Sequence, residues 1–175
     1  PMWFAGEAQL ANYAYGWGRT PWFGNWAQEH RATREAVGLF DMSSFAKFRV
    51  QGSDAEAVLN QVCCNNVAVD LGCTVYTQCL NERGGIESDL TVTRLAGDDY
   101  LVVTSAGAQV RDMHWLKTHT PPDARCVATD VTAGYAVLAV MGPRTRDVLQ
   151  PLVSVDLSNE SFPFGTSREI ELGYA

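Results

Sequence analysis

The sequence predicts an α+β fold with a mainly antiparallel sheet and packed helices. Several short apolar or alternating stretches typical of β-strands are separated by stretches of helical periodicity. Two central strands, predicted over 75–80 and 86–95, are joined by Asn81-Glu82-Arg83-Gly84-Gly85, a run typical of a tight turn between antiparallel strands. The chain has 175 residues, of which 46% are hydrophobic and 10% aromatic, so it is large enough to bury a core.

The first 24 residues are predicted to form an aromatic-rich arm, separate from the folded part over 25–175. Aromatic side chains lie there among glycines and two prolines with little periodicity: Trp3, Phe4, Tyr13, Tyr15, Trp17, Trp22 and Phe23. Aromatic residues this dense are seldom left in water, so we expect an irregular arm that packs on another surface. A helix is then predicted from Asn25, as N-cap, to about Val37, with Gln28 in the capping-box position.

The remaining elements follow from periodicity and from turn residues. Strands are predicted over 39–42, 45–51, 75–80, 86–95, 100–104, 126–131, 135–141 and 169–174. In the second strand, Phe45, Lys47, Arg49 and Gln51 are expected on a wet face, opposite the buried face. Helices are predicted from a capping box at 53–56 to residue 63, over 106–118, and from 142–143 to 150 with proline in the first turn. Within 106–118, Val110, Met113 and Leu116 are expected on one face.

Charge and cysteine usage exclude several classes of protein. With 13 Lys and Arg against 20 Asp and Glu the net charge is −7, and no basic stripe is present, so nucleic acid and anionic membranes are not expected partners. No apolar run reaches the roughly 18 residues of a membrane span. Five cysteines, two of them adjacent (Cys63 and Cys64), suit neither a disulfide framework nor a zinc clip. We therefore expect a reducing compartment and no structural metal.

Three segments in order resemble the aminomethyltransferase family, the glycine-cleavage T-protein. They are Gly38-Leu39-Phe40-Asp41-Met42-Ser43, the stretch from Tyr76 to Leu90 with its Asn-Glu-x-Gly-Gly-Ile turn and Asp-Leu pair, and Gly142-Pro143-Arg144 before a helix. Within this family, the chain resembles most closely the C-terminal folate domain of dimethylglycine and sarcosine dehydrogenases. This closer resemblance lies in the aromatic-rich arm, in residues 19–23 and in Phe45-Ala46-Lys47-Phe48. The resemblance implies the fold of the folate-binding T-protein domain. It also implies a fragment of a larger flavoenzyme, truncated at its C-terminus, with FAD in an upstream domain absent from this chain.

The resemblance implies a tetrahydrofolate-dependent one-carbon transfer domain. Asp89 matches the family's carboxylate beside the folate amine, and we predict it as the catalytic residue. Tyr76 matches the tyrosine that packs on the ligand, Thr91 a position beside the pterin, and Val103 with Thr104 a segment touching the pterin through backbone groups. We predict these five residues as the folate site.

Without the resemblance, the residues themselves are also compatible with ordinary structural roles. Alternation places Asp89, Thr91 and Thr93 on a polar strand face opposite Leu90 and Val92, which suits a cavity wall or an ordinary solvated face. Tyr76 suits a half-buried sheet aromatic, and Val103 suits core packing.

Four further residues are weaker candidates. Asn65 and Asn66 fit turn and helix-cap positions better than positions in a ligand cavity. Arg144 and Arg146 fit an ordinary solvated helix face better than a binding site for the glutamate tail of folate.

An alternative function is a non-catalytic regulatory or interaction module of the same family, and a third is a stand-alone folate-dependent demethylase. Expected partners are folate, the rest of the parent flavoenzyme and, through exposed apolar surface, further copies of the chain. The expected compartment is the bacterial cytoplasm, or alternatively the mitochondrial matrix.

Overall fold

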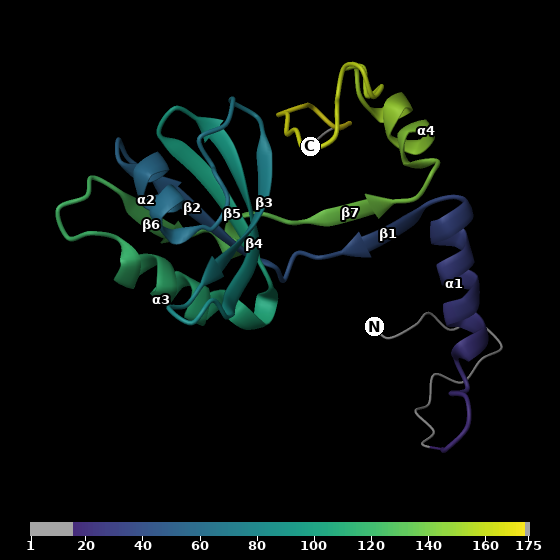
Figure 1. Cartoon of the computed structure of the whole chain (residues 1–175). Coiled ribbons are helices and arrows are strands. Elements are labelled where there is room, and N and C mark those ends of the chain that lie inside the picture. The colour runs from purple at the N-terminus through teal and green to yellow at the C-terminus, as the bar shows by residue number, and fades with distance from the viewer. Residues whose placement is uncertain (1–15, 174–175) are drawn as a thin grey trace.

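A five-stranded antiparallel sheet forms the body of the molecule. The computed structural model describes residues 16–173. The strand order is β3-β4-β5-β2-β6, and each neighbouring pair is antiparallel (Figure 1). The strands are β2 (Ala46–Gln51), β3 (Thr74–Leu80), β4 (Ile86–Ala96), β5 (Asp99–Thr104) and β6 (Val127–Asp130). The predicted α+β class with a mainly antiparallel sheet is confirmed.

One face of this sheet carries the core. The helices α2 (Ala55–Val62) and α3 (Gln109–His119) contribute Leu59 and Leu116 to a cluster with Phe48, Val92 and Val102 from the strands. Residues paired across an antiparallel ladder share a face, and Val102 pairs with both Phe48 and Val92. The alternate residues therefore point to the opposite face of the sheet, which neither α2 nor α3 covers.

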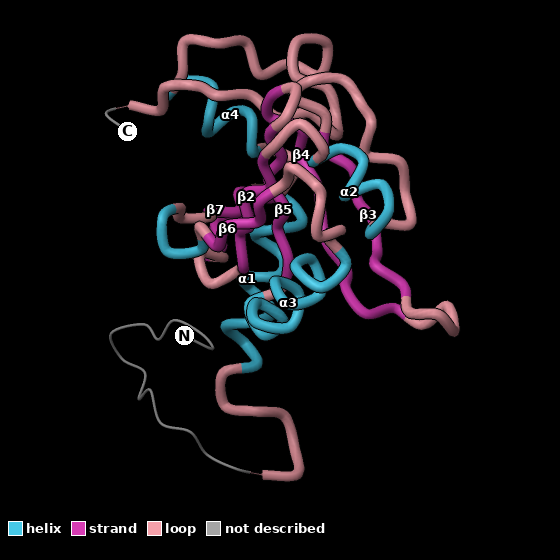
Figure 2. Tube along the Cα trace, turned by 90° about the vertical axis from the view of Figure 1, so that its left-hand side faces the viewer, coloured by secondary structure: helices cyan, strands magenta, loops and turns pink. Residues whose placement is uncertain are grey.

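A separate two-stranded ribbon extends from the sheet. It pairs β1 (Gly38–Asp41) with β7 (Leu138–Met141) in antiparallel register. The helix α1 (Phe23–Glu35) runs below the ribbon and α4 (Thr145–Leu149) lies above it, as both views show (Figures 1 and 2). Short 3-10 turns over 106–108, 132–134 and 150–152 complete the regular structure of the described chain.

Lys47 holds the ribbon to the sheet and departs from the predicted wet face. Its side chain is 1% exposed, and its ammonium donates to the carbonyl oxygens of Ser43 and Tyr135, both at 2.8 Å. These two carbonyls belong to the two chain segments that connect the sheet to the ribbon. Strand alternation places Lys47 on the face opposite the core, but it does not indicate that these segments cover that part of the face. The buried face of the same strand, with Ala46, Phe48 and Val50, is confirmed.

The tight turn between the central strands is confirmed. The Asn81 amide donates to the Gly85 carbonyl at 2.9 Å, and the Asn81 side-chain oxygen accepts from the amides of Arg83 and Gly85 at 3.0 and 2.9 Å. Gly84 adopts a φ of 76°, a left-handed conformation that glycine tolerates best.

Both predicted helix caps are wrong. The first helix starts at Phe23, before Asn25, because the Trp22 carbonyl accepts from the amides of Asn25 and Trp26 at 3.0 and 3.2 Å. The capping box at 53–56 would make Ser53 the N-cap, but α2 starts at Ala55 and the Ser53 hydroxyl donates to the Asp54 carboxylate at 3.4 Å. The Asp54 carboxylate in turn accepts from the amide of Arg125 at 2.8 Å, in the loop before β6. In both cases a backbone or distant partner took the place of the local capping bond.

Three other boundaries differ from the prediction. Residues 169–173 form no strand, and Tyr174 lies outside the described residues. The segment 106–118 opens with a 3-10 turn, and Val110 is exposed because Asp112, Met113 and Leu116 occupy the inward face of α3. Pro143 precedes α4, which begins at Thr145.

The part of the arm that the structure describes packs only in part. Trp22 is 2% exposed and meets Trp26 edge-on at 5.9 Å between ring centroids, whereas Trp17 stands fully in solvent. The aromatic residues before Gly16 lie outside the described residues, and packing of the arm on another surface stays a prediction. No helix between residues 16 and 173 is long and apolar enough to cross a membrane.

Candidate functional site

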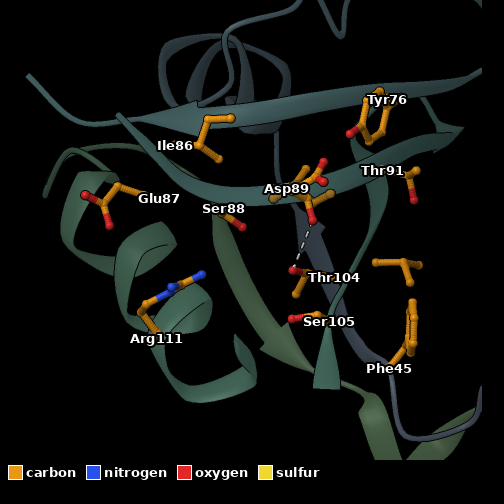
Figure 3. Close-up of a pocket in the computed structure, with 12 residues that line it drawn as sticks. Phe45, Tyr76, Ile86, Glu87, Ser88, Asp89, Thr91, Thr104, Ser105 and Arg111 are labelled. Atoms are coloured by element: carbon orange, nitrogen blue, oxygen red, sulfur yellow. Dashed lines mark hydrogen bonds between the residues drawn. The ribbon is translucent and has the colours of Figure 1, made fainter. Parts of the chain in front are cut away.

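A cavity of about 510 Å³ lies at the edge of the sheet where β3, β4 and β5 meet the start of α3. All five residues predicted as the folate site line it: Tyr76, Asp89, Thr91, Val103 and Thr104. Figure 3 shows Tyr76, Asp89 and Thr91 projecting from the neighbouring strands β3 and β4. The structure therefore brings the predicted residues together around one hollow, and their role as ligands stays a prediction.

Asp89 and Tyr76 face each other on the open side of the sheet. Asp89 pairs in register with Gln78, whose side-chain amide donates to the Asp89 Oδ1 at 3.4 Å. Tyr76, two residues earlier on β3, is 61% exposed. The Asp89 carboxylate raises the pKa of the Tyr76 phenol, and the Gln78 side chain partly opposes this shift. The pair thus offers a solvent-accessible carboxylate near a phenol on the neighbouring strand.

A row of side chains across three strands forms the floor of the cavity. Thr91 pairs with Tyr76 on one side and with Val103 on the other, so the three side chains share one face of the sheet. Leu90 and Val92, by contrast, are buried in the core. The predicted separation of a polar face with Asp89 and Thr91 from an apolar face is confirmed, while Thr93 is buried and bonded to Thr74 at 2.9 Å.

Thr104 contributes to the cavity differently from the other four predicted residues. It pairs with Leu90 and therefore points its side chain toward the core face. Its hydroxyl donates to the carboxylate of Asp112 at 2.6 Å and lies 3.5 Å from the Asp89 carbonyl, the contact drawn as a dashed line in Figure 3. The Thr104 hydroxyl is thus engaged with Asp112, and a backbone contact of residue 104 with a ligand stays a prediction.

Seven lining residues were not predicted as site residues from the sequence: Phe45, Ile86, Glu87, Ser88, Leu90, Ser105 and Arg111. Arg111 lies in the first turn of α3 and donates through Nε to the Asp112 carboxylate at 3.1 Å. Its guanidinium is the cationic group among the lining residues, which also include the carboxylates of Glu87 and Asp89. No local sequence signal marks Arg111, because it reaches the cavity only through the docking of α3 against the sheet.

The weaker candidates lie outside this cavity. The Asn65 side-chain amide donates to the Tyr76 carbonyl at 3.2 Å, and its backbone amide donates to the Thr77 hydroxyl at 3.0 Å, which is turn chemistry. Arg144 is exposed and pairs with Asp147 at 3.3 Å, as a solvated helix face would. Arg146 donates to the Leu157 carbonyl.

The part of the chain that the structure describes contains no disulfide bond and no candidate metal site. All five cysteines are free, and residues 16–173 contain no cluster of three His, Cys, Asp or Glu side chains that would hold a metal ion. The polar groups of the cavity are thus carboxylates, hydroxyls and a guanidinium, which suit an organic ligand with hydrogen-bonding edges.

The sequence of the whole chain, residues 1–175, matches the GCVT N-terminal domain. The chain belongs to this family. A solved structure of the glycine cleavage system aminomethyltransferase T from Bartonella henselae superposes with a TM-score of 0.69 at 28% identity, covering 81% of this chain and 40% of that one. The predicted resemblance to the T-protein, in sequence and in fold, is confirmed.

Three relatives show how this family domain occurs in longer proteins. The chain is 40% identical to a 4-methylaminobutanoate oxidase (formaldehyde-forming) of Paenarthrobacter nicotinovorans, over 99% of this chain and 21% of that protein. It is 35% identical to the mouse mitochondrial pyruvate dehydrogenase phosphatase regulatory subunit (88% and 18%) and 31% identical to rat mitochondrial dimethylglycine dehydrogenase (98% and 20%). The chain therefore spans about one fifth of the length of these relatives. It is an aminomethyltransferase-like domain related to enzymes that oxidise methylated amines.

Proposed function

We propose that this domain binds tetrahydrofolate in the cavity around Asp89 and takes part in transfer of a one-carbon unit from a methylated amine. The observation that carries the proposal is the exposed Asp89 carboxylate, held beside the Tyr76 hydroxyl at the open edge of the cavity. The volume of about 510 Å³ lies within the range of small-molecule sites. Phe45 and Tyr76 provide aromatic surface for a planar ring, and carboxylate and hydroxyl groups lie between them.

Each residue has a distinct part in this proposal. Tetrahydrofolate, when bound, supplies the secondary amine that accepts the one-carbon unit. Asp89 would accept a hydrogen bond from that amine and stabilise positive charge developing on it, as a preorganised carboxylate does. The Tyr76 phenol, whose pKa the Asp89 carboxylate raises further, would stay protonated and present a hydroxyl donor at the cavity. Thr91 and Val103 would form the surface on which the ring rests.

The relatives support a place for this domain beside an amine-oxidising partner. The relative that is 40% identical to this chain is a formaldehyde-forming 4-methylaminobutanoate oxidase. We infer that a flavin-bearing domain of the parent protein releases the carbon unit and that this domain receives it. With five free cysteines, a reducing compartment such as the bacterial cytoplasm or the mitochondrial matrix fits the proposal.

Anaerobic titration with tetrahydrofolate, followed by quenching of the five tryptophans, tests the binding. Replacing Asp89 by Asn keeps the shape and removes the charge, and the dissociation constant is expected to rise by about 10- to 100-fold, the worth of a charge-assisted hydrogen bond. The matched control is Asp98→Asn, an exposed aspartate in the turn between β4 and β5, outside the cavity lining. Equal affinity of the Asp89→Asn and unmodified chains would remove Asp89 from its role, and no saturable binding by the unmodified chain would contradict the proposal.

A second function is favoured by one relative, the regulatory subunit that is 35% identical to this chain. A regulatory module of this family would use the same cavity for binding without chemistry. A transfer assay with formaldehyde and tetrahydrofolate separates the two. If folate binds but the unmodified chain captures the carbon unit no faster than the uncatalysed reaction, and Asp89→Asn leaves that rate unchanged, the domain is a binding module.

A further inference from the structure

A buried carboxylate lies directly behind the wall of the cavity. The Asp112 side chain is 2% exposed and sits in the first turn of α3. It accepts hydrogen bonds from the Ser88 hydroxyl at 2.7 Å, the Thr104 hydroxyl at 2.6 Å and the Arg111 Nε at 3.1 Å. Asp112 does not line the cavity, but all three of its partners do.

The partners of Asp112 come from three separate elements. Ser88 belongs to β4, Thr104 ends β5, and Arg111 belongs to α3. A carboxylate removed from water costs several kcal/mol unless hydrogen bonds and opposite charge replace its hydration. Here two short hydroxyl bonds, a guanidinium and the N-terminal end of α3 provide that replacement. Displacement of any one element would leave a buried charge partly unsolvated, so the network fixes the three elements relative to one another.

The network reaches Asp89 along two routes. Ser88 is its neighbour in sequence, and because strand residues alternate, Ser88 is anchored to Asp112 while Asp89 points into the cavity. The Thr104 hydroxyl lies 2.6 Å from the Asp112 carboxylate and 3.5 Å from the Asp89 carbonyl. Asp89 thus lies next to an anchored residue, Ser88, and its carbonyl lies close to a second partner of Asp112, the Thr104 hydroxyl.

We propose that Asp112 is a positioning residue of the cavity, setting the place of Asp89 relative to Tyr76 and that of the Arg111 guanidinium at the cavity edge. The consequence for tetrahydrofolate affinity rests on the proposed function, whereas the consequence for the Asp89–Tyr76 pair does not. Asp112 acts through its partners and makes no contact with ligand.

The first test needs no ligand and reads the Tyr76 phenol. Asp89 raises the pKa of Tyr76. In the full chain with 13Cζ-labelled tyrosine, assigned by Tyr76→Phe, the ring carbon reports phenol ionisation across an NMR pH titration. We expect Asp89→Asn to lower the Tyr76 pKa toward the ordinary tyrosine value, and Asp112→Asn to lower it in the same direction, because Asp89 is released from its position. The other charged groups of the cavity are Glu87 and Arg111; both are present in the two variants, and Asp112→Asn in addition removes the ion-pair partner of Arg111.

The matched control is a second ion-paired aspartate of the same sheet. Asp99 is paired with Arg49 and lies outside the cavity lining. Asp99→Asn is expected to lower stability and leave the Tyr76 pKa unchanged. If Asp112→Asn fails to fold, Ser88→Ala with Thr104→Val removes the two hydroxyl bonds while keeping the carboxylate, and the same fall in the Tyr76 pKa is expected. A Tyr76 pKa that is unmoved by Asp112→Asn, or moved equally by Asp99→Asn, overturns the proposal.

The second test measures tetrahydrofolate affinity in the same variants. Asp112→Asn is expected to weaken binding about 10-fold at a temperature where it is fully folded, and Asp112→Glu to recover part of that loss. The effects of Asp112→Asn and Ser88→Ala should be non-additive, because they break the same bond. A fall in the Tyr76 pKa together with no folate binding by the unmodified chain would contradict the proposed function and still support the positioning role. Folate binding that Asp112→Asn leaves intact, with the Tyr76 pKa unmoved, would contradict the positioning role alone.

Discussion

At the scale of single residues, the charged groups that leave water are each matched to specific partners. Lys47 donates to two carbonyl oxygens, Asp112 accepts from two hydroxyls and a guanidinium, and Asp99 is paired with Arg49. Each set joins elements that are distant in sequence, such as Lys47 with Tyr135. Burying these charged groups costs desolvation free energy, so they are tolerated only where their partners are in place. Because each partner must lie at hydrogen-bond distance, these contacts restrict the relative positions of the strands and of α3 more than apolar packing alone would.

The Arg49–Asp99 pair gives the fold a specific acid sensitivity. The hydrogen bond from Arg49 lowers the pKa of Asp99, outweighing the opposing effect of burial. A folded-state pKa below the unfolded value of about 3.9 means that the pair stabilises at higher pH and that this stability is lost as pH falls through the folded-state pKa. Urea unfolding should show Asp99→Asn less stable than the unmodified chain by about 2 kcal/mol at pH 7. The difference should shrink at pH 3 and below; an equal difference at both pH values would contradict this assignment.

At the scale of elements, the strands and the hairpin were predictable because their signals are local. Alternation in 45–51 and the Asn81–Gly85 turn required no knowledge of the rest of the chain, and the same alternation turned Asp89 and Thr91 toward one face. Helix starts were not predictable, because the Asp54 carboxylate bonds to Arg125, 71 residues away. Arg111 and Asp112 were missed for the same reason: the docking of α3 decides which of its side chains meet the cavity.

The turn from β2 into α2 depends on a glycine. Gly52 has a φ of 134°, and a Cβ placed there would lie 2.0 Å from the Arg125 carbonyl oxygen. Gly52→Ala should therefore destabilise the chain by about 1–3 kcal/mol through backbone strain and displacement of the 125–126 loop. Gly97→Ala is the matched control, since no atom lies within 4 Å of a Cβ there, and it should change stability by no more than about 0.5 kcal/mol. Thermal unfolding of both variants checks this, and equal melting temperatures would contradict it.

At the scale of the whole molecule, the body and the ribbon differ in how well they are covered. The five-stranded sheet has a core beneath α2 and α3. The ribbon of β1 and β7 joins α4 and the C-terminal loops around an apolar groove of about 620 Å³, lined by residues that include Leu39, Leu138 and Leu152. These three side chains are each more than half exposed. A two-stranded ribbon is marginal by itself, and an open aliphatic groove of this size favours association.

We therefore expect the chain in solution to self-associate through this groove. Leu138→Lys places an ammonium on the groove face of β7, across the strand pair from Asp41, which tolerates the charge in the free chain. Burying that ammonium in an apolar contact costs more than the roughly 1.4 kcal/mol that corresponds to a tenfold change in affinity, so the self-association constant should fall at least about 10-fold. The matched control is Val127→Lys on β6, whose valine is similarly exposed but lies outside the groove. Sedimentation velocity over a concentration series measures both. Association that Leu138→Lys and Val127→Lys weaken to the same extent would show that general net charge, rather than the groove, governs it. A monomeric unmodified chain over the whole concentration series would contradict the prediction.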